Sequence, residues 1–418
     1  MKRCGKLKHA ILIELVLLLL LLAVRQAAGT PASVTSDSVL MEENAEEETG
    51  KDYIKWVDFN VSCEALSQAY ETDVDTYRED YHIDWISLLA YTAARNGGEF
   101  GKQALKDMEA LAEKIKNGET TLEEAAADLK NYDYFYEAYD AVLGGMVGEF
   151  LLQEPDESGN LVWKRKYGLK AYSPIAKGFP YTDYDDFGSS RSYGYKRPHL
   201  GHDMMGQIGT PVAAVESGYV EVMGWNQYGG WRIGIRSFDG KRYYYYAHLR
   251  QDSPFAEGLE EGSAVTAGDI IGYMGHTGYS KTENVNNIKT VHLHWGLELI
   301  FDESQKESDN EIWIDCYQLS RFLYLNRSEA VKVDGSKEWK RVYGMEDPAV
   351  EKYLEEHGGA VSGNGVSEND SVRIPFAIKT EQPSKETIAA MLEAERIAKD
   401  PSVKGYTDLD ELFADLKK

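Results

Sequence analysis

Two histidines stand one residue apart in the segment TVHLHWGLEL, residues 290–299. In a β-strand, side chains at positions i and i+2 point to the same face of the sheet. His292 and His294 would therefore emerge side by side, while Leu293 and Trp295 face the opposite way. A buried sheet face has no structural use for two adjacent imidazoles, so the segment predicts a ligand.

A second motif, HLGHD, places His199 and Asp203 four positions apart. On an extended strand, positions i and i+4 share a face, so the two side chains can converge on one point. Gly201 and the following GQIGTPV disfavour a helix here. An imidazole nitrogen and a carboxylate oxygen suit Zn²⁺. Either His292 or His294 would complete three protein ligands and leave an open fourth position, as in catalytic zinc sites.

Acid–base chemistry at such a site would fall to histidine, because the sequence has no HExxH motif to supply a glutamate. Zinc lowers the pKa of its bound water from about 15.7 to about 7. A neutral imidazole beside the metal could accept that proton and later return it to a leaving group. The two adjacent imidazoles are therefore interpreted as one metal ligand and one proton carrier.

Three motifs occur in the order HLGHD, YYAHL and HLHWG, and together they resemble the LytM/lysostaphin-type zinc endopeptidases. The runs TPVAAVESGYVEVMGWNQYGG and VTAGDIIGYMGHTG look like strands and turns of the same family. The resemblance covers residues 172–300. It implies a zinc metalloendopeptidase that cleaves peptide cross-links of bacterial cell walls, with peptidoglycan stem peptides or cross-bridges as its partners.

The resemblance also implies roles for individual residues. One Zn²⁺ would be bound by His199, Asp203 and His294. His248 of YYAHL and His292 of HLHWG would be the catalytic imidazoles beside it.

Three further residues near the first motif are candidates for a role in the site. The family has a small or apolar residue where His202 stands, so His202 is expected either to contact a ligand from outside or to be exposed. A tyrosine ahead of this motif often assists the transition state in the family. Tyr193 and Tyr195 are both candidates, and the spacing does not choose between them.

The elements that must position these residues fall in residues 172–330, where short β-rich runs alternate with Gly and Pro. YVEVMGW and WRIGIRS show strand alternation, and the dipeptide at 239–240 is an Asp-Gly hairpin signal. This predicts an antiparallel, all-β LytM-like catalytic domain. Residues 57–160 show helical spacing, including a capping box of Thr121 and Glu124. The predicted fold class is therefore α+β, with a helical domain before the sheet domain.

Residues 1–29 have a basic start, a long apolar stretch and then small residues, the layout of a secretory signal peptide. The apolar stretch falls short of about 20 residues, the usual length of a membrane span. Length alone therefore does not favour retention as a membrane anchor, and both outcomes stay open. The remainder is expected to be exported to the cell wall or extracellular face, with membrane contact only through this segment. Residues 30–56 are typical of an acidic linker.

Residues 331–371 are expected to form a helical extension and linker, and residues 372–418 an acidic helical tail. The tail resembles the toxin-binding half of RelB/DinJ antitoxins, although the DNA-binding half that would precede it has no counterpart here. Antitoxins act in the cytosol, whereas this chain is expected to be exported. A fusion of two reading frames is the favoured interpretation, and a toxin-type partner for the tail is the less favoured one.

Composition narrows the choice of function. The formal charge of −25 argues against a nucleic-acid partner, because phosphate backbones are held mainly by Lys and Arg. The sequence contains no CxxC motif, so a zinc site built from thiolates is not supported. Cys63 and Cys316 are interpreted as buried thiols, with a disulfide between them as the alternative. Two other classes compete with the peptidase: a LytM-like scaffold or activator that no longer cleaves, and an exported interaction protein built on the helical and acidic regions.

Overall fold

The structure is a computed structural model that describes residues 57, 59–193, 195–306 and 310–358. The predicted signal or anchor segment, the acidic linker and the antitoxin-like tail lie outside the described residues. Of the helices in the described part of the chain, none is long and apolar enough to cross a membrane.

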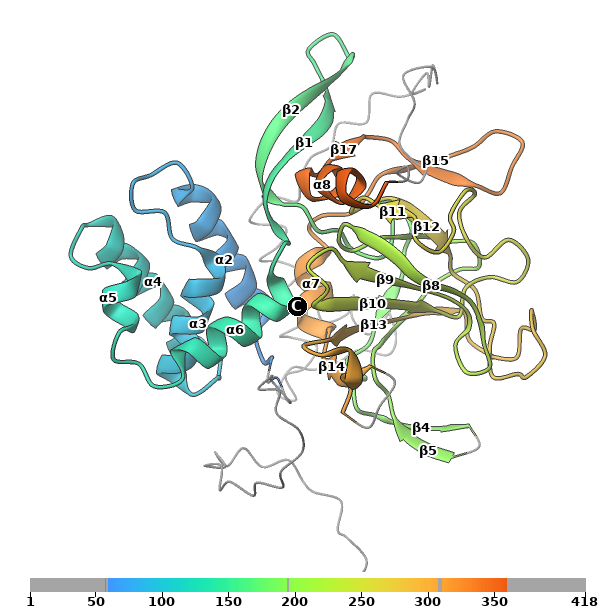
Figure 1. Ribbon diagram of the computed structural model, residues 1–418, viewed down its shortest axis with the longest axis horizontal. Helices are drawn as coiled ribbons and strands as arrows, with labels where there is room; N and C mark the ends of the chain where they lie inside the picture. The colour runs from blue at the N-terminus through green and yellow to red at the C-terminus, as the bar shows by residue number, and fades with distance from the viewer. Residues whose placement is uncertain (1–56, 58, 194, 307–309, 359–418) are drawn as a thin grey trace, which may run out of the picture. The chain divides into compact units, whose positions relative to one another are not determined.

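The described chain begins with helices, coloured blue to teal in Figure 1. In chain order they are α2 (Cys63–Thr76), α3 (Trp85–Asn96), α4 (Lys102–Lys116), α5 (Leu122–Ala126) and α6 (Tyr132–Leu143). The predicted capping box is present at the start of α5, where Thr121 and Glu124 each bond the other's backbone N–H. Cys63 and Cys316 are both buried and form no disulfide, so the alternative of a disulfide between them is wrong.

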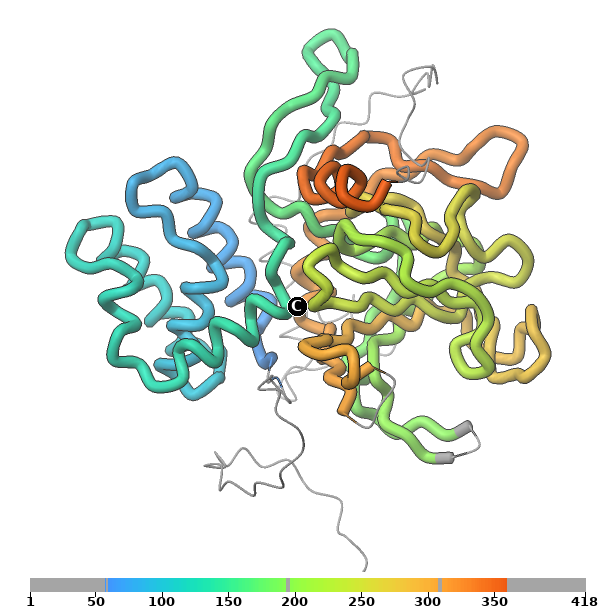
Figure 2. Tube along the Cα trace, in the orientation of Figure 1, coloured from blue at the N-terminus to red at the C-terminus, as the bar shows by residue number. Residues whose placement is uncertain are grey.

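Helical structure ends earlier than predicted. The sequence predicts a helical domain through residue 160, but after α6 the chain enters a β-hairpin of β1 (Val147–Pro155) and β2 (Leu161–Leu169), which Figure 2 traces. The turn explains the difference. The carboxylate of Asp156 accepts the backbone N–H groups of Ser158 and Asn160. This local turn chemistry outweighs the helical pattern around it.

The described part of the predicted helical extension after residue 331 is mixed. β15 (Ala330–Lys332) and β16 (Trp339–Arg341) form a hairpin, and β17 (Met345–Glu346) pairs with β1. Only α8 (Pro348–His357) is an α-helix there, so the expectation of a helical extension is wrong for the segment before it.

The centre of the described chain is an eight-stranded antiparallel sheet, as predicted, with the order β11-β8-β9-β10-β13-β6-β3 and with β14 paired to β13. Gly240 has a φ of 76° in the predicted hairpin turn between β9 and β10. The sheet strands are β3 (Thr182–Asp183), β6 (His202–Met205), β8 (Gly218–Asn226), β9 (Gly230–Ser237), β10 (Arg242–Ala247), β11 (Ala264–Val265), β13 (His292–Leu299) and β14 (Ile312–Ile314). The remaining elements are β4 (Ser190–Tyr193), β5 (Tyr195–Pro198), β7 (Pro211–Ala213), β12 (Ile270–Tyr273), the 3₁₀ turn η1 (Glu303–Gln305) and α7 (Tyr317–Leu323).

The sheet has one apolar face and one face that carries histidines. Along β13, Leu293 and Trp295 are fully buried and belong to the same core as Phe322 of α7. Burying each such side chain stabilises the fold by about 1.5–3 kcal/mol. His292 and His294 alternate with these residues and therefore lie on the opposite face. The apolar core thus determines which face of β13 presents the imidazoles.

A buried ion pair joins the sheet to α6. Arg242, at the start of β10, is only 1% exposed, and its guanidinium binds the Glu216 carboxylate at 2.8 and 3.1 Å. The same guanidinium donates to the carbonyl oxygens of Asp140 and Ala141 near the end of α6. Carbonyl groups at a helix C-terminus lack intrahelical donors and attract cations. Arg242 therefore neutralises Glu216 and also supplies hydrogen-bond donors to the carbonyl groups at the end of α6.

Replacing Arg242 with alanine is expected to lower the free energy of unfolding by about 3–5 kcal/mol, because the Glu216 carboxylate would be buried without its counter-ion. Lys241→Ala is the matched control. Lys241 also contacts α6, through Asp140 at 2.6 Å, but its side chain is 40% exposed. Its loss should lower the free energy of unfolding by about 1 kcal/mol or less. Urea denaturation measures both, and equal effects would contradict the role given to Arg242.

Candidate metal centre and active site

The pairing of β6 with β13 brings together the three residues predicted to bind zinc. Asp203 on β6 lies directly opposite His294 on β13, and His294 Nδ1 is 3.1 Å from Asp203 Oδ1. His199 Nε2 is 2.8 Å from His294 Nδ1 and 3.0 Å from Asp203 Oδ1. Within the described residues, these three offer donor atoms that could share one ion.

His199 reaches this point by a different route from the one predicted. The sequence predicts an extended strand from His199 to Asp203, but β6 begins only at His202, and His199 lies in the loop before it. At Gly201 the backbone passes against the ring of His294. A Cβ atom there would lie 2.6 Å from His294 Cε1 and 2.7 Å from Nε2. Only glycine leaves room for that ring.

The donor set fits zinc. Two imidazole nitrogens and one carboxylate oxygen are ligands that Zn²⁺ prefers, and bonds of about 2.0–2.1 Å in a tetrahedral site separate the ligand atoms by roughly 3.3 Å. The three donor distances of 2.8, 3.0 and 3.1 Å are close to that separation. Burial alone would raise the pKa of the Asp203 carboxyl, but the contacts with His199 and His294 hold it well below its usual range. The carboxylate is therefore ionised, as a ligand must be.

Two residues that sequence reasoning missed, Asp186 and Arg191, hold the donors from outside. His199 Nδ1 lies 3.1 Å from the backbone carbonyl oxygen of Asp186 and 3.2 Å from its carboxylate. This nitrogen therefore carries the proton, and Nε2 is left for a metal. Arg191 donates to the carboxylates of Asp186 at 2.5 Å and of Asp203 at 3.1 Å. Neither residue belongs to a motif, so no signal in the sequence singles them out.

His202 is buried on the other face of β6, with only 1% of its surface exposed. Its Nε2 atom pairs with the carboxylate of Asp183, and its Nδ1 atom lies 3.6 Å from Asp186 Oδ1. Burial alone would lower the pKa of His202, but the two carboxylates raise it to about 9. The exposed alternative for His202 is wrong. Protonated His202 places a positive charge next to Asp186, and Asp186 in turn contacts His199.

The two histidines predicted to be catalytic lie beside the metal donors. The ring centroids of His248 and His292 are 4.7 Å apart, and His292 Nε2 is 3.7 Å from Asp203 Oδ1. His248 donates its Nδ1–H to the carbonyl oxygen of Thr277, and His292 donates to that of Thr290, both at 2.9 Å. Both rings are therefore held in the tautomer whose Nε2 has a free lone pair.

His248 is placed to remain neutral. It directly follows β10 with a φ of 60°, an uncommon conformation for a residue other than glycine. Burial, together with the neighbouring imidazoles of His292 and His294, holds the pKa of His248 well below 6.5. An uncharged imidazole at neutral pH is the form that can accept a proton.

Tyr193 and Tyr195, the two candidates for assisting the transition state, are paired across the β4–β5 hairpin. Their side chains lie outside the described part of the structure, so this role stays a prediction. Three tyrosines that the sequence did not single out line the cleft beside the metal donors, namely Tyr228, Tyr245 and Tyr279. Burial raises the pKa of Tyr245 to about 12, so its hydroxyl remains a hydrogen-bond donor at neutral pH.

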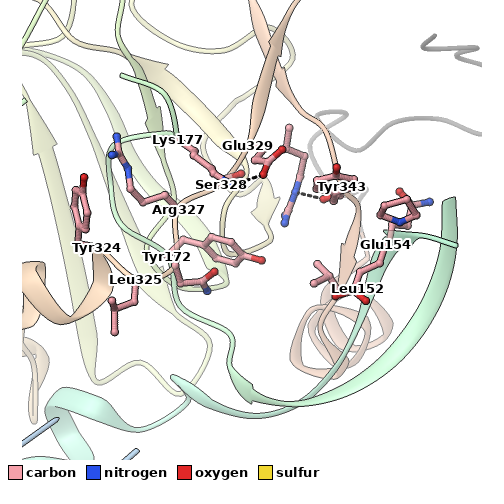
Figure 3. Close-up of a pocket in the computed structure, with 14 residues that line it drawn as sticks. Leu152, Glu154, Tyr172, Lys177, Tyr324, Leu325, Arg327, Ser328, Glu329 and Tyr343 are labelled. Atoms are coloured by element: carbon pink, nitrogen blue, oxygen red, sulfur yellow. Dashed lines mark hydrogen bonds and ion pairs between the residues drawn. The ribbon is translucent and has the colours of Figure 1, made fainter. Parts of the chain in front are cut away.

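Two cavities differ in whether their basic side chains are paired with groups of the chain itself. The cleft at the metal donors has a volume of about 70 Å³. A larger cavity of about 500 Å³ shares no lining residue with it and lies beside β1, as Figure 3 shows. The basic side chains of the larger cavity are all paired: Lys177 with Glu329, Arg341 with Asp269, and Arg327 with backbone carbonyl oxygens. Its cations therefore require no ligand.

Gly201→Ala is expected to weaken zinc binding by roughly 100-fold, because the new Cβ would displace the ring of a ligand and precise ligand placement governs affinity. Gly224→Ala is the matched control. Gly224 has a similar φ, 140° against 154°, but a Cβ there would meet nothing within 4 Å. Competition with a chromophoric zinc chelator measures both affinities. Equal losses in the two variants would show that backbone strain, not contact with His294, is responsible.

Asp186→Asn is expected to weaken zinc binding by about 10- to 100-fold, since the variant loses the carboxylate that orients His199 and pairs with Arg191. Asp185→Asn, which removes an exposed neighbouring carboxylate, is the control and should leave the affinity unchanged. The same chelator competition applies, with circular dichroism to verify the fold. An unchanged affinity in Asp186→Asn would show that its backbone carbonyl oxygen orients His199 without help.

Comparisons with known proteins agree with this geometry. Residues 197–310 match the model of peptidase family M23. An L-Ala–D-Glu endopeptidase of Bacillus subtilis is 39% identical over 138 residues, which cover 31% of this chain and 41% of that protein. A glycyl-glycine endopeptidase of Staphylococcus capitis is 37% identical over 89 residues, covering 21% of this chain and 23% of that protein. The chain thus spans less than half the length of either relative.

Among solved structures, the catalytic domain of lysostaphin from Staphylococcus simulans is 30% identical, with a TM-score of 0.27 and coverage of 34% of this chain and 92% of that one. The matched segment of the family model contains the three metal donors and the two histidines predicted to be catalytic. Residues 197–310 of this chain are a domain of peptidase family M23.

Proposed function

We propose that this chain is an exported, zinc-dependent endopeptidase that hydrolyses peptide bonds in bacterial peptidoglycan. The proposal is carried by one observation: three zinc-type donors lie within 3.1 Å of one another, beside two imidazoles whose Nε2 atoms are free. The relatives support the reaction, since one is named for the L-Ala–D-Glu bond and another for the glycyl-glycine bond. Export rests on the basic and apolar N-terminal sequence.

When bound, zinc would supply an acidified water, with a pKa of about 7, and a positive charge that polarises the scissile carbonyl. The residues of the chain divide the remaining work. His199, Asp203 and His294 hold the ion, and the free Nε2 of His248 accepts a proton from water in the cleft. Because Nδ1–H of His248 stays bonded to Thr277, the ring can return that proton from Nε2 to the leaving amine without turning.

His292 provides a second imidazole on the same side of the cleft. Its ring is held by the carbonyl oxygen of Thr290, and its Nε2 atom points toward the metal donors. Once protonated at Nε2, it can donate to the oxygen on which negative charge develops.

The second candidate function is a LytM-like scaffold or activator that no longer cleaves. A domain that has lost activity would be expected to lack a ligand or a catalytic histidine. Here all five of these side chains are present and line one cleft. This observation favours the enzyme over the scaffold.

His294→Ala is expected to abolish both stoichiometric zinc binding and hydrolysis of purified cell walls. His248→Ala should retain zinc but lower the rate of hydrolysis by about 10²- to 10⁴-fold, the usual contribution of a general base. His357→Ala, at an exposed position in α8, is the control and should change neither. Zinc content is measured on the purified protein, and hydrolysis by the new amino termini released from walls.

The outcomes separate the hypotheses. Stoichiometric zinc in His294→Ala would refute the ligand assignment. A wild-type protein that binds zinc and walls but releases no amino termini would be the scaffold instead.

A further inference from the structure

Two arginines face each other on the β4–β5 hairpin. Arg191 on β4 lies directly opposite Arg197 on β5, so the two side chains share one face. Both line the cleft of about 70 Å³ that contains the metal donors and the catalytic histidines. Like charges directly opposite each other on an antiparallel pair are destabilising. Each arginine therefore needs an anion.

Arg191 pairs with two carboxylates, whereas Arg197 pairs with none in the part of the chain that the structure describes. Asp186 and Asp203 neutralise Arg191. The Arg197 guanidinium makes one hydrogen bond, to the hydroxyl of Tyr279 at 3.4 Å, and its Nε atom is buried without a partner. Among the residues that the structure describes, no carboxylate pairs with it.

Arg197 lies close to the reacting groups. The ring of Tyr279, which accepts its hydrogen bond, is centred 6.1 Å from the ring of His248. Arg197, Tyr279 and His248 line the same cleft, together with His292 and the metal donors. An anion held by Arg197 would therefore lie in the same cleft as the reacting groups, which places it on a residue that flanks the scissile bond.

We infer that Arg197 is a binding site for a free carboxylate of the substrate, carried by a residue next to the scissile bond; this rests on the proposed function. A guanidinium presents paired N–H donors that match the two oxygens of a carboxylate. Arg197 is the cation in the cleft whose donors remain available for one.

This assignment distinguishes two classes of cross-link. A glutamate beside the scissile bond has two carboxyl groups, and a linear chain consumes at most one of them, so one stays free and charged. The residues on both sides of a glycyl-glycine bond carry no charged side chain. The charge at Arg197 therefore assigns this chain to acidic peptides in preference to glycine bridges.

The test uses two synthetic peptides that differ only at the glutamate beside the scissile bond, whose free carboxylate is a carboxamide in the second peptide. The zinc-loaded full chain is expected to cleave the acid with a kcat/KM about 10- to 100-fold above that for the amide, the usual effect of a hydrogen bond to a charged group. In Arg197→Gln, the preference for the acid over the amide should be lost, so that both peptides are cleaved with the same kcat/KM.

Lys196→Gln is the matched control. It removes the same charge from the same strand, but its side chain is exposed and alternates to the other face of the hairpin. It should keep the preference for the acid. Equal rates for both peptides in the wild type, or a preference that survives in Arg197→Gln, would overturn the inference. Zinc content and circular dichroism verify that each variant is folded and loaded.

Failure of the inference and failure of the proposed function give different results. Hydrolysis of purified walls without any preference between the peptides overturns the inference alone. If neither walls nor peptides are hydrolysed, the proposed function fails, and calorimetric binding of the two peptides to the zinc-loaded protein then decides the inference. Tighter binding of the acid that is lost in Arg197→Gln supports it, and equal binding overturns it.

Discussion

The site depends on the register between β6 and β13. Asp203 stands directly opposite His294, and this pairing sets the distance between two of the three metal donors. Side chains alternate with a period of two along a strand, so a slip by one residue would turn every side chain of β13 to the other face. Leu293 and Trp295 resist that slip, because both are fully buried in the core. Apolar burial on one face therefore holds the geometry of a polar site on the other.

The charged side chains that hold the metal donors from outside are paired with opposite charges. Asp183 and Asp186 flank His202, and Asp186 also contacts His199 and Arg191. Buried ions are tolerated only with such partners, because removal from water is otherwise too unfavourable. The network keeps the donors in place before any ion arrives, which is the role that outer contacts have in metal sites.

Local patterns predicted much of this arrangement, and long-range contacts account for what they missed. Period-two alternation is sufficient to place His292 and His294 on one face of a strand. The order of the motifs adds the prediction that His199, from a distant segment, lies next to them. The route to His199 was wrong because a close approach to another strand at Gly201 is invisible in a local pattern. Asp186 was missed for the same reason, because it meets His199, His202 and Arg191 only in the folded chain. β1 and the turn at Asp156 fall inside the predicted helical domain, because the turn is formed by side-chain contacts that helical spacing does not reveal.

The hydrogen bonds from Arg242 to the end of α6 limit where this chain can be divided into separate domains. Residues of α6 and of β13 belong to one continuous core. In addition, the carbonyl oxygens near the end of α6 accept hydrogen bonds from the guanidinium of Arg242, which belongs to the sheet. The catalytic sheet is therefore not a module that can be excised at the boundary suggested by motifs alone. A chimera that grafts this sheet onto another scaffold would have to carry α6 with it, or supply new acceptors and apolar cover in its place.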